Sequence, residues 1–385
     1  MKMLVLGAGP MGYAIVKDLV KDESISEVTA IDINVQRLRR LEESVKSEKL
    51  STIKMDVMDK TSLLKLMKKH DCILGALPHR FVVHTNKVAI EAGVSLVDLA
   101  FEKEQLDLDE EARKNDVTII PGCGVAPGLS NMLVAYGASK MEKVNKAYIR
   151  VGGIPLNPKP PLDYKIVFSV ESLIGEYIRP AKIVKDGKII HVPALSGIEV
   201  FTDPELGELE CFYTDGLSTL IYTMKHIPNM AEKTIRWPGH AEKIKVLREL
   251  GFFDTKPIKI KDITITPFHL SAKLLNEKLS MKEDDKDLTI LIVDVIGLKG
   301  NTQIHCNYRM IDYYDSEEKI TSMGRTSGFP CAIMARMIVK GEVKGPGVIP
   351  PEIALTPSKF EEFTRELAKR NIVVSETITT IKTLG

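Results

Sequence analysis

Three glycines near the N-terminus have the spacing of a turn that binds dinucleotides. The apolar run 3–6 leads into Gly7-Ala8-Gly9-Pro10-Met11-Gly12, and a helical pattern follows. In such a motif the first glycine permits a tight turn, the second lets a pyrophosphate approach the backbone, and the third lets the helix pack close to the strand. The start of the helix adds free N–H groups for the phosphates, and Pro10 is tolerated there because that turn lacks intrahelical partners.

An acidic residue stands at the end of the next apolar run, 28–31. Asp32 follows Gly12 by 20 residues, close to the spacing of the acid that accepts hydrogen bonds from ribose hydroxyls. Because a carboxylate at this position repels a 2′-phosphate, the sequence predicts NAD as the cofactor. Arg37, Arg39 and Arg40 keep NADP open as an alternative, although their spacing fits an exposed helix face better.

Apolar strands and helical patterns continue to alternate up to about residue 120. Strand patterns at 51–55, 72–76, 94–97 and 117–120 alternate with helical patterns at 34–48, 59–69, 80–92 and 104–114. Six strands separated by helices predict an α/β fold, a doubly wound parallel Rossmann sheet whose ligands bind beyond the carboxyl ends of the strands. The predicted cofactor contacts on that rim are Gly7, Gly9, Pro10, Met11, Gly12, Asp32, Asp56, Val57, Ala76, Leu77, Pro78, Asp98, Gly124, Val125 and Ala126.

After about residue 126 hairpin signals replace this alternation. Asp186-Gly187, between the strand patterns 181–184 and 188–191, is typical of a two-residue hairpin turn. We therefore predict an α+β, mixed-sheet domain over 126–325 for substrate binding and oligomerisation. The strongly apolar helix at 328–340 must be buried on several sides, so the NAD-binding domain is predicted over 1–125 and 326–351. Residues 352–385 are predicted to form a C-terminal tail that packs back on the body.

The overall composition excludes several classes of protein. Lys and Arg number 53 against 52 Asp and Glu, so a nucleic-acid or polybasic membrane partner is not expected. No apolar run approaches the roughly 18 residues of a membrane span, and the N-terminal apolar residues belong to the first strand rather than to a signal peptide. Five scattered cysteines indicate a reducing, cytoplasmic location. The histidines show no metal-ligand spacing, so no metal site is predicted.

Several blocks of sequence are more specific than the glycine turn. Gly124 to Asn131 has the pattern G-x-x-P-G-h-x-N after the last Rossmann strand. The other blocks are Tyr136-Gly137-Ala138, Val151-Gly152-Gly153-Ile154-Pro155, Tyr164 to Ser169, Lys233 to Lys243, Ala354-Leu355 and Val374-Ser375-Glu376.

Together these blocks resemble the saccharopine dehydrogenase-like family, and within it the NAD-dependent amine dehydrogenases known as lysine 6-dehydrogenases. The resemblance covers nearly the whole chain. It implies oxidation at the ε-amino carbon of L-lysine, hydride transfer to C4 of the nicotinamide, and hydrolysis of the imine to a semialdehyde that can cyclise.

Amine oxidation sets its own chemical requirements. A lysine amine has a pKa near 10.4, so presenting it uncharged at neutral pH costs roughly 4–5 kcal/mol. A general base or a desolvated pocket is needed for the amine, and a cation for the substrate carboxylate. The candidate bases are His240, Lys165 and His79. The candidate substrate contacts are Asn131, Tyr164, Phe168, Arg236 and Lys243, with Arg325 as a further cation and Trp237 as a further apolar wall. Cys123 is expected to be a packing residue rather than a nucleophile.

Two other functions remain open at this point. A saccharopine reductase or a carboxynorspermidine dehydrogenase-type enzyme would need more cations and usually NADP, which Asp32 argues against. A non-catalytic NAD-binding sensor would not need the dense block 236–243 as a second pocket. The expected partners are a small amino-acid or amine substrate and further copies of the chain in a homodimer or larger homo-oligomer, because the edges of the hairpin-built sheet must be covered.

Overall fold

The computed structural model describes residues 1–282 and 284–382, which form two units. Unit 1 comprises 1–142, 218–224 and 324–374, and unit 2 comprises 143–217, 225–323 and the described residues from 375 onward. The first boundary lies after residue 142 and not after 125, because α6 (Leu129–Ala138) packs on α12 (Pro351–Ala354) and α13 (Pro357–Ala368) of unit 1. The predicted tail 352–385 is divided between the units at residue 374, and its last three residues lie outside the described chain.

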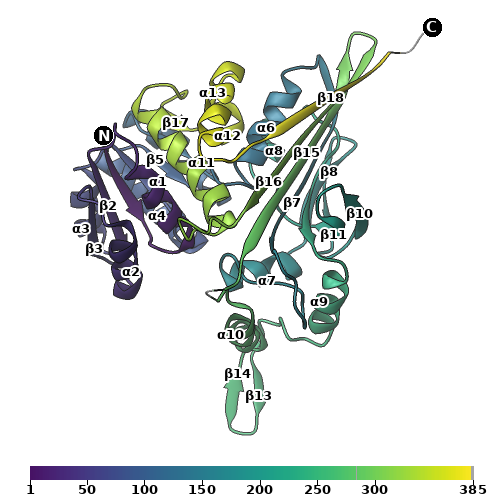
Figure 1. The fold of residues 1–385 in the computed structure, drawn as a ribbon, viewed down its shortest axis with the longest axis horizontal. Helices are drawn as coiled ribbons and strands as arrows, with labels where there is room; N and C mark the ends of the chain where they lie inside the picture. The colour runs from purple at the N-terminus through teal and green to yellow at the C-terminus, as the bar shows by residue number, and fades with distance from the viewer. Residues whose placement is uncertain (283, 383–385) are drawn as a thin grey trace. The chain divides into compact units, whose positions relative to one another are not determined.

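A parallel sheet forms the centre of unit 1 and confirms the predicted Rossmann architecture (Figure 1). Its order is β17-β6-β5-β4-β1-β2-β3, with β1 (Lys2–Leu6), β2 (Glu27–Asp32), β3 (Leu50–Lys54), β4 (Cys72–Gly75), β5 (Leu96–Asp98), β6 (Thr118–Ile120) and β17 (Gly347–Val348). The seventh strand, β17, was not predicted, because two residues carry no periodic signal. It pairs in parallel with β6 and brings a distant part of the chain into the sheet.

Helices connect these strands as the sequence pattern indicates. They are α1 (Pro10–Leu19), α2 (Val35–Val45), α3 (Lys60–Met67), α4 (Val82–Ala92) and α5 (Asp109–Lys114), with short 3-10 turns η1 (His79–Phe81) and η2 (Lys103–Leu108). The one-turn helix α8 (Leu220–Thr223) also belongs to unit 1 but connects none of these strands. The apolar helix α11 (Ser322–Val339) starts six residues earlier than the predicted 328. Among the described residues no helix is both long and apolar enough to cross a membrane.

Unit 2 is built on a nine-stranded mixed sheet, as predicted for the second domain. Its main path is β10-β11-β12-β7-β15-β16-β18, and β8 and β9 branch from β12. The strands are β7 (Lys143–Pro155), β8 (Ala181–Lys185), β9 (Lys188–Val192), β10 (Glu199–Asp203), β11 (Gly207–Tyr213), β12 (Met230–Arg236), β15 (Asp287–Lys299), β16 (Thr302–Tyr313) and β18 (Ser375–Lys382). Part of the predicted tail is therefore an edge strand, because β18 pairs antiparallel with β16.

Three helices and a separate two-stranded ribbon complete unit 2. The helices are α7 (Val170–Ile178), α9 (His240–Glu249) and α10 (Pro267–Leu279). Residues of all three share a core with Phe212, on one face of the sheet. The ribbon of β13 (Ile258–Ile260) and β14 (Ile263–Ile265) projects beyond α10 (Figure 1). The other face of the sheet carries a second apolar core that includes Ile154, Leu209, Ile235 and Ile290.

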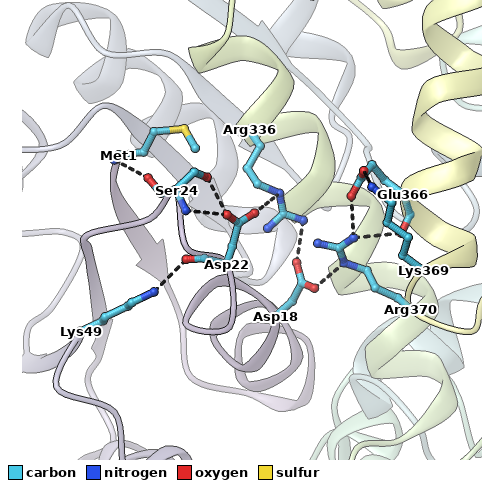
Figure 2. Close-up of polar contacts among 9 residues, drawn as sticks. All are labelled: Met1, Asp18, Asp22, Ser24, Lys49, Arg336, Glu366, Lys369 and Arg370. Atoms are coloured by element: carbon cyan, nitrogen blue, oxygen red, sulfur yellow. Dashed lines mark hydrogen bonds and ion pairs between the residues drawn. The ribbon is translucent and has the colours of Figure 1, made fainter.

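A buried network of charges ties α1 to the C-terminal part of unit 1 (Figure 2). The Asp18 carboxylate accepts a hydrogen bond of 2.7 Å from Arg336 of α11 and another from Arg370, which follows α13. Arg336 also lies 3.4 Å from Asp22, and Arg370 is held by Glu366 at 2.9 Å. Because Asp18 is more than 300 residues from both Arg336 and Arg370 in sequence, the network closes the discontinuous unit as one body.

Candidate functional site

The glycine turn of unit 1 has the geometry that a pyrophosphate requires. Gly7 has a φ of +101°, and a Cβ there would lie 2.6 Å from the carbonyl oxygen of Ala76. A Cβ on Gly12 would lie 1.8 Å from the carbonyl oxygen of Gly7, so the helix approaches the turn too closely for any side chain. A Cβ on Gly9 would meet no described atom within 4 Å. The open space therefore lies at Gly9, next to the first N–H groups of α1.

Asp32 lies beside this turn at the carboxyl end of β2. One carboxylate oxygen accepts a 2.8 Å hydrogen bond from the Ala8 N–H, and the other accepts a 2.7 Å bond from the Asn34 N–H. Arg37, with an exposed side chain, places Nη1 3.7 Å from the same carboxylate. The acid is thus fixed at the mouth of the glycine turn, the place at which a ribose is recognised in this fold.

The other predicted cofactor positions also stand at the carboxyl ends of the strands, along the same edge of the sheet. Asp98 is fully buried, where its carboxyl accepts hydrogen bonds from the Asn86 amide and the Ala100 N–H. Burial raises the pKa of Asp98 to about 7. The Asp98 carboxyl joins the loop after β5 to α4, and a contact of Asp98 with the cofactor stays a prediction. The other predicted contacts follow strand ends, namely Asp56 and Val57 after β3, Ala76, Leu77 and Pro78 after β4, and Gly124, Val125 and Ala126 after β6.

The loop after β6 is held by its own side chains. Asn131 is buried, and its amide accepts from the Ser130 hydroxyl and donates to Thr219 at 3.1 Å. The Thr219 hydroxyl donates in turn to the Glu352 carboxylate. These contacts give Asn131 a role in shaping the loop in place of the predicted substrate contact. Burial also raises the pKa of the Cys123 thiol, in keeping with the expected packing role.

Three of the predicted basic residues contact acidic side chains. His79 lies at the rim of unit 1, exposed, with Nδ1 2.8 Å from Glu102. Lys165 pairs with Asp285 at 2.7 Å, and Lys243 pairs with Asp163 at 2.5 Å. Each lysine is thus paired within unit 2, and the roles of Lys165 as a base and Lys243 as a substrate contact stay predictions. Arg325 of unit 1 donates to the backbone carbonyl of Arg370.

A cluster of buried polar side chains lies on one face of the unit 2 sheet. Arg236, at the end of β12, is only 2% exposed and forms a 2.8 Å ion pair with Glu176 of α7. Its guanidinium stacks over the Tyr164 ring, 4.6 Å from the centroid. Burial raises the pKa of Glu176 even though Arg236 favours the charged form. Among the described atoms, Arg236 Nε and the Tyr164 hydroxyl have no hydrogen-bond partner.

His240 belongs to this cluster, but its surroundings do not suit a general base. Nδ1 lies 2.9 Å from the Leu162 carbonyl, and Nε2 lies 2.8 Å from the Tyr177 hydroxyl. Burial lowers the pKa of His240 to about 3, with the positive charge of Arg236 adding to the effect. The imidazole is therefore neutral with both nitrogens engaged, and the predicted base is better described as a structural link between α9 and α7.

The sequence did not single out Glu232, two strand positions before Thr234. Its carboxyl is buried on the same face as Arg236, and Oε2 has no hydrogen-bond partner in the part of the chain that the structure describes. Burial raises the pKa of Glu232 to about 8, and the negative charges of Glu176 and Asp215 act in the same direction. A Cβ on Gly216 would lie 1.7 Å from Oε2, so only glycine leaves room for this carboxyl.

The predicted aromatic residues lie in different places. Tyr164 is in the buried cluster, and the partly buried Phe168 packs against the same core. Trp237 belongs to the core on the opposite face of the sheet, where its indole N–H donates to the Pro155 carbonyl at 2.9 Å. Over the described residues, no group of three or more His, Cys, Asp or Glu side chains is arranged to hold a metal ion.

Comparison with known proteins gives a consistent family. A family model described as "Saccharopine dehydrogenase C-terminal domain" matches residues 124–373, and one described as "Saccharopine dehydrogenase NADP binding domain" matches residues 3–120. The chain is 23% identical over 428 residues to a protein of Saccharomyces cerevisiae named saccharopine dehydrogenase (NADP(+), L-glutamate-forming), covering 91% of this chain and 93% of that protein. It is 21% identical over 425 residues to the mitochondrial alpha-aminoadipic semialdehyde synthase of Bos taurus, of which it spans 45%.

The fold is also shared with a solved structure. The apo saccharopine dehydrogenase (L-Glu forming) of Saccharomyces cerevisiae superposes with a TM-score of 0.82 at 21% identity, over 98% of this chain and 99% of that one. The first family model by itself spans well over half of the present chain. The chain therefore belongs to the saccharopine dehydrogenase family of nicotinamide-dependent oxidoreductases.

Proposed function

We propose that this protein is an NAD-dependent lysine 6-dehydrogenase. In the proposed reaction the lysine ε-ammonium loses a proton and the ε-carbon loses a hydride, giving an iminium ion. Water then converts the iminium ion to the semialdehyde and ammonium. NAD, when bound, supplies the hydride acceptor at nicotinamide C4. The residues of unit 1 hold its phosphates and ribose, and the residues of unit 2 bind the substrate and manage its protons.

The observation that carries this proposal is the composition of the buried cluster in unit 2. Arg236 Nε and the Tyr164 hydroxyl are two donors without partners among the described atoms, and the Arg236 guanidinium lies 4.6 Å from the centre of the Tyr164 ring. Two such donors suit one carboxylate. Lys165, Lys243 and Lys233 are paired with acids. Arg236 is also paired, with Glu176, but its Nε is left over as a donor. A cluster with donors for one carboxylate matches lysine better than saccharopine, which carries three.

The preference for NAD over NADP rests on Asp32. Its carboxylate is fixed beside the glycine turn by two backbone N–H groups, where it accepts hydrogen bonds from a ribose and repels a 2′-phosphate. NADP is the second candidate, favoured by the name of the matching family model and of the yeast relative. Arg37 lies close enough to Asp32 to take part in either case.

A second candidate substrate is saccharopine, which the names of the relatives favour. Saccharopine and lysine are oxidised at the same carbon and differ in whether the nitrogen carries a glutarate group. Purified protein should be assayed for NADH or NADPH formation with L-lysine, saccharopine and, as a control one methylene shorter, L-ornithine. We expect the highest kcat/KM with L-lysine and NAD. A higher value with saccharopine and NADP would replace the proposal with the second candidate, and binding of NADH without any turnover would favour a non-catalytic sensor.

We also propose that the protein is a homo-oligomer, at least a dimer. The ribbon β13–β14 turns four isoleucines to one face, of which Ile258, Ile260 and Ile263 are 47%, 51% and 64% exposed. An isolated two-stranded ribbon is marginal in water, so a second copy that covers this face would stabilise it. Light scattering at micromolar concentration should give at least twice the mass of the chain, and a monomeric mass would contradict the proposal.

The five free, buried thiols suit a reducing, cytoplasmic location.

A further inference from the structure

Within the described chain, Glu232 differs from the other acids on its face of the sheet in having neither a counter-charge nor a pair of backbone N–H donors. The Glu176 carboxylate pairs with Arg236 at 2.8 Å, and Asp215 pairs with Lys182 at 3.0 Å. Glu210 accepts hydrogen bonds from the Gly239 and Ala241 N–H groups at the start of α9. Glu232, 5% exposed, has the Thr214 hydroxyl as a hydrogen-bonding neighbour and an unpartnered Oε2.

A balance of charge shows what the cluster lacks. Glu176 with Arg236 and Asp215 with Lys182 are neutral pairs, and Arg179 also faces Glu176. No Lys or Arg among the described residues forms an ion pair with Glu232, so its carboxylate would have no direct counter-charge once ionised. Burying an unpaired carboxylate is costly, so the group keeps its proton until a cation arrives. The pKa of Glu232 is raised to about 8 for the same reason, since burial disfavours the charged carboxylate.

We propose that Glu232 binds the reacting ammonium group of the substrate and then accepts a proton from that group. This inference rests on the proposed amine oxidation. It assigns to Glu232 the role of general base, which the buried, neutral His240 does not fill. On binding at neutral pH, Glu232 releases its proton to solvent and the carboxylate pairs with the ammonium. One N–H bond then breaks as an O–H bond forms on Glu232, which leaves the neutral amine from whose carbon a hydride departs.

The placement of Glu232 and Arg236 suits the two ends of one substrate. They are four residues apart on β12, roughly 13 Å between Cα atoms at the rise of a strand. Both side chains project to the same face, because strand residues alternate. Glu176, which pairs with Arg236, also raises the pKa of Glu232 by its charge, so both side chains lie on the side of the sheet that α7 covers. A substrate that places a carboxylate at Arg236 and a distal ammonium at Glu232 is an ω-amino acid.

The first test is the pH dependence of kcat/KM for L-lysine, which reports groups of the free enzyme. We expect a rise through about pH 8 in the wild type, and in Glu232→Gln a loss of that inflection with kcat lower by about 100-fold, a typical contribution of a general base. Affinity for NADH and the melting temperature should not change. Asp215→Asn is the matched control: it removes a facing negative charge, so the inflection should shift to lower pH while the plateau value of kcat is retained.

The second test does not require turnover. Calorimetry at pH 7 in buffers of different ionisation enthalpy counts the protons released when a ligand binds. With L-lysine, and with n-pentylamine as a simple ammonium probe, we expect release of about one proton in the wild type and none in Glu232→Gln, since a group with a pKa near 8 is mostly protonated at pH 7.

The outcomes separate the two proposals. Turnover of lysine with an unchanged pH profile in Glu232→Gln overturns the role of Glu232 and leaves the function standing. Absence of turnover together with proton release on binding n-pentylamine, lost in the variant, supports the ammonium site and rejects the function. Absence of binding of either amine, or binding without proton release, overturns the assignment of Glu232.

Discussion

Asp32→Ala is expected to change the cofactor preference of the protein. The kcat/KM for NAD should fall, because the ribose loses hydrogen bonds to a charged acceptor, worth about 1.5–3 kcal/mol. The kcat/KM for NADP should rise, because the repulsion of the 2′-phosphate disappears. Together these effects should shift the NAD to NADP ratio by about 10- to 100-fold. Steady-state kinetics with both cofactors measure it.

Two further variants show whether the effect comes from charge or from the loop. The carboxylate also holds the Ala8 and Asn34 N–H groups, so the melting temperature of Asp32→Ala should fall. Asp32→Asn keeps an acceptor for one of these groups without the charge, and it should improve the use of NADP with a smaller loss of stability. Arg37→Ala tests the opposite assignment. Equal use of NAD and NADP by the wild type, with a strong loss of NADP in Arg37→Ala, would assign this site to NADP.

Gly9→Ala is expected to weaken cofactor binding, whereas Gly12→Ala is expected to lower stability. The backbone at Gly9, with φ −69° and ψ −175°, is open to any residue, and a Cβ there meets no described atom within 4 Å. Alanine at this position should leave the melting temperature unchanged and weaken NADH binding at least tenfold, because the methyl group occupies the approach of the pyrophosphate. At Gly12 a Cβ would lie 1.8 Å from the Gly7 carbonyl oxygen, so α1 must shift. We expect destabilisation by about 1–3 kcal/mol, typical of overpacking.

Each of these variants serves as the control for the other. NADH binding is measured by fluorescence titration, and stability by thermal or urea unfolding. A Gly9→Ala protein that binds NADH within twofold of the wild type would place the phosphates elsewhere. A Gly12→Ala protein of unchanged stability would mean that the close approach of α1 to the turn is not a feature of the protein in solution.

The sequence by itself determined the architecture of unit 1 and the residues of its nucleotide turn. Strand, glycine turn, helix and acid follow one another within 32 residues, and each carries a local signal: apolar runs, glycine spacing and helical periodicity. The carboxyl ends of parallel strands meet at one edge, so the position of Asp32 beside Gly9 follows from the order of the elements alone. Hairpin signals such as Asp186-Gly187 likewise indicated the mixed sheet of unit 2.

Only the tertiary structure decided which polar residues of unit 2 act together. Strand β12 is buried along its whole length, with Glu232, Lys233 and Arg236 among its residues, so it lacks the polar–apolar alternation that reveals a strand in sequence. The identification of Glu232 required β12 and the loop after β11 to meet. His240 does not suit the role of general base because its two ring nitrogens contact Leu162 and Tyr177, which are 78 and 63 residues away in sequence. Burial and counter-charge arise from such long-range packing, and they decide which ionisable group holds its proton at neutral pH.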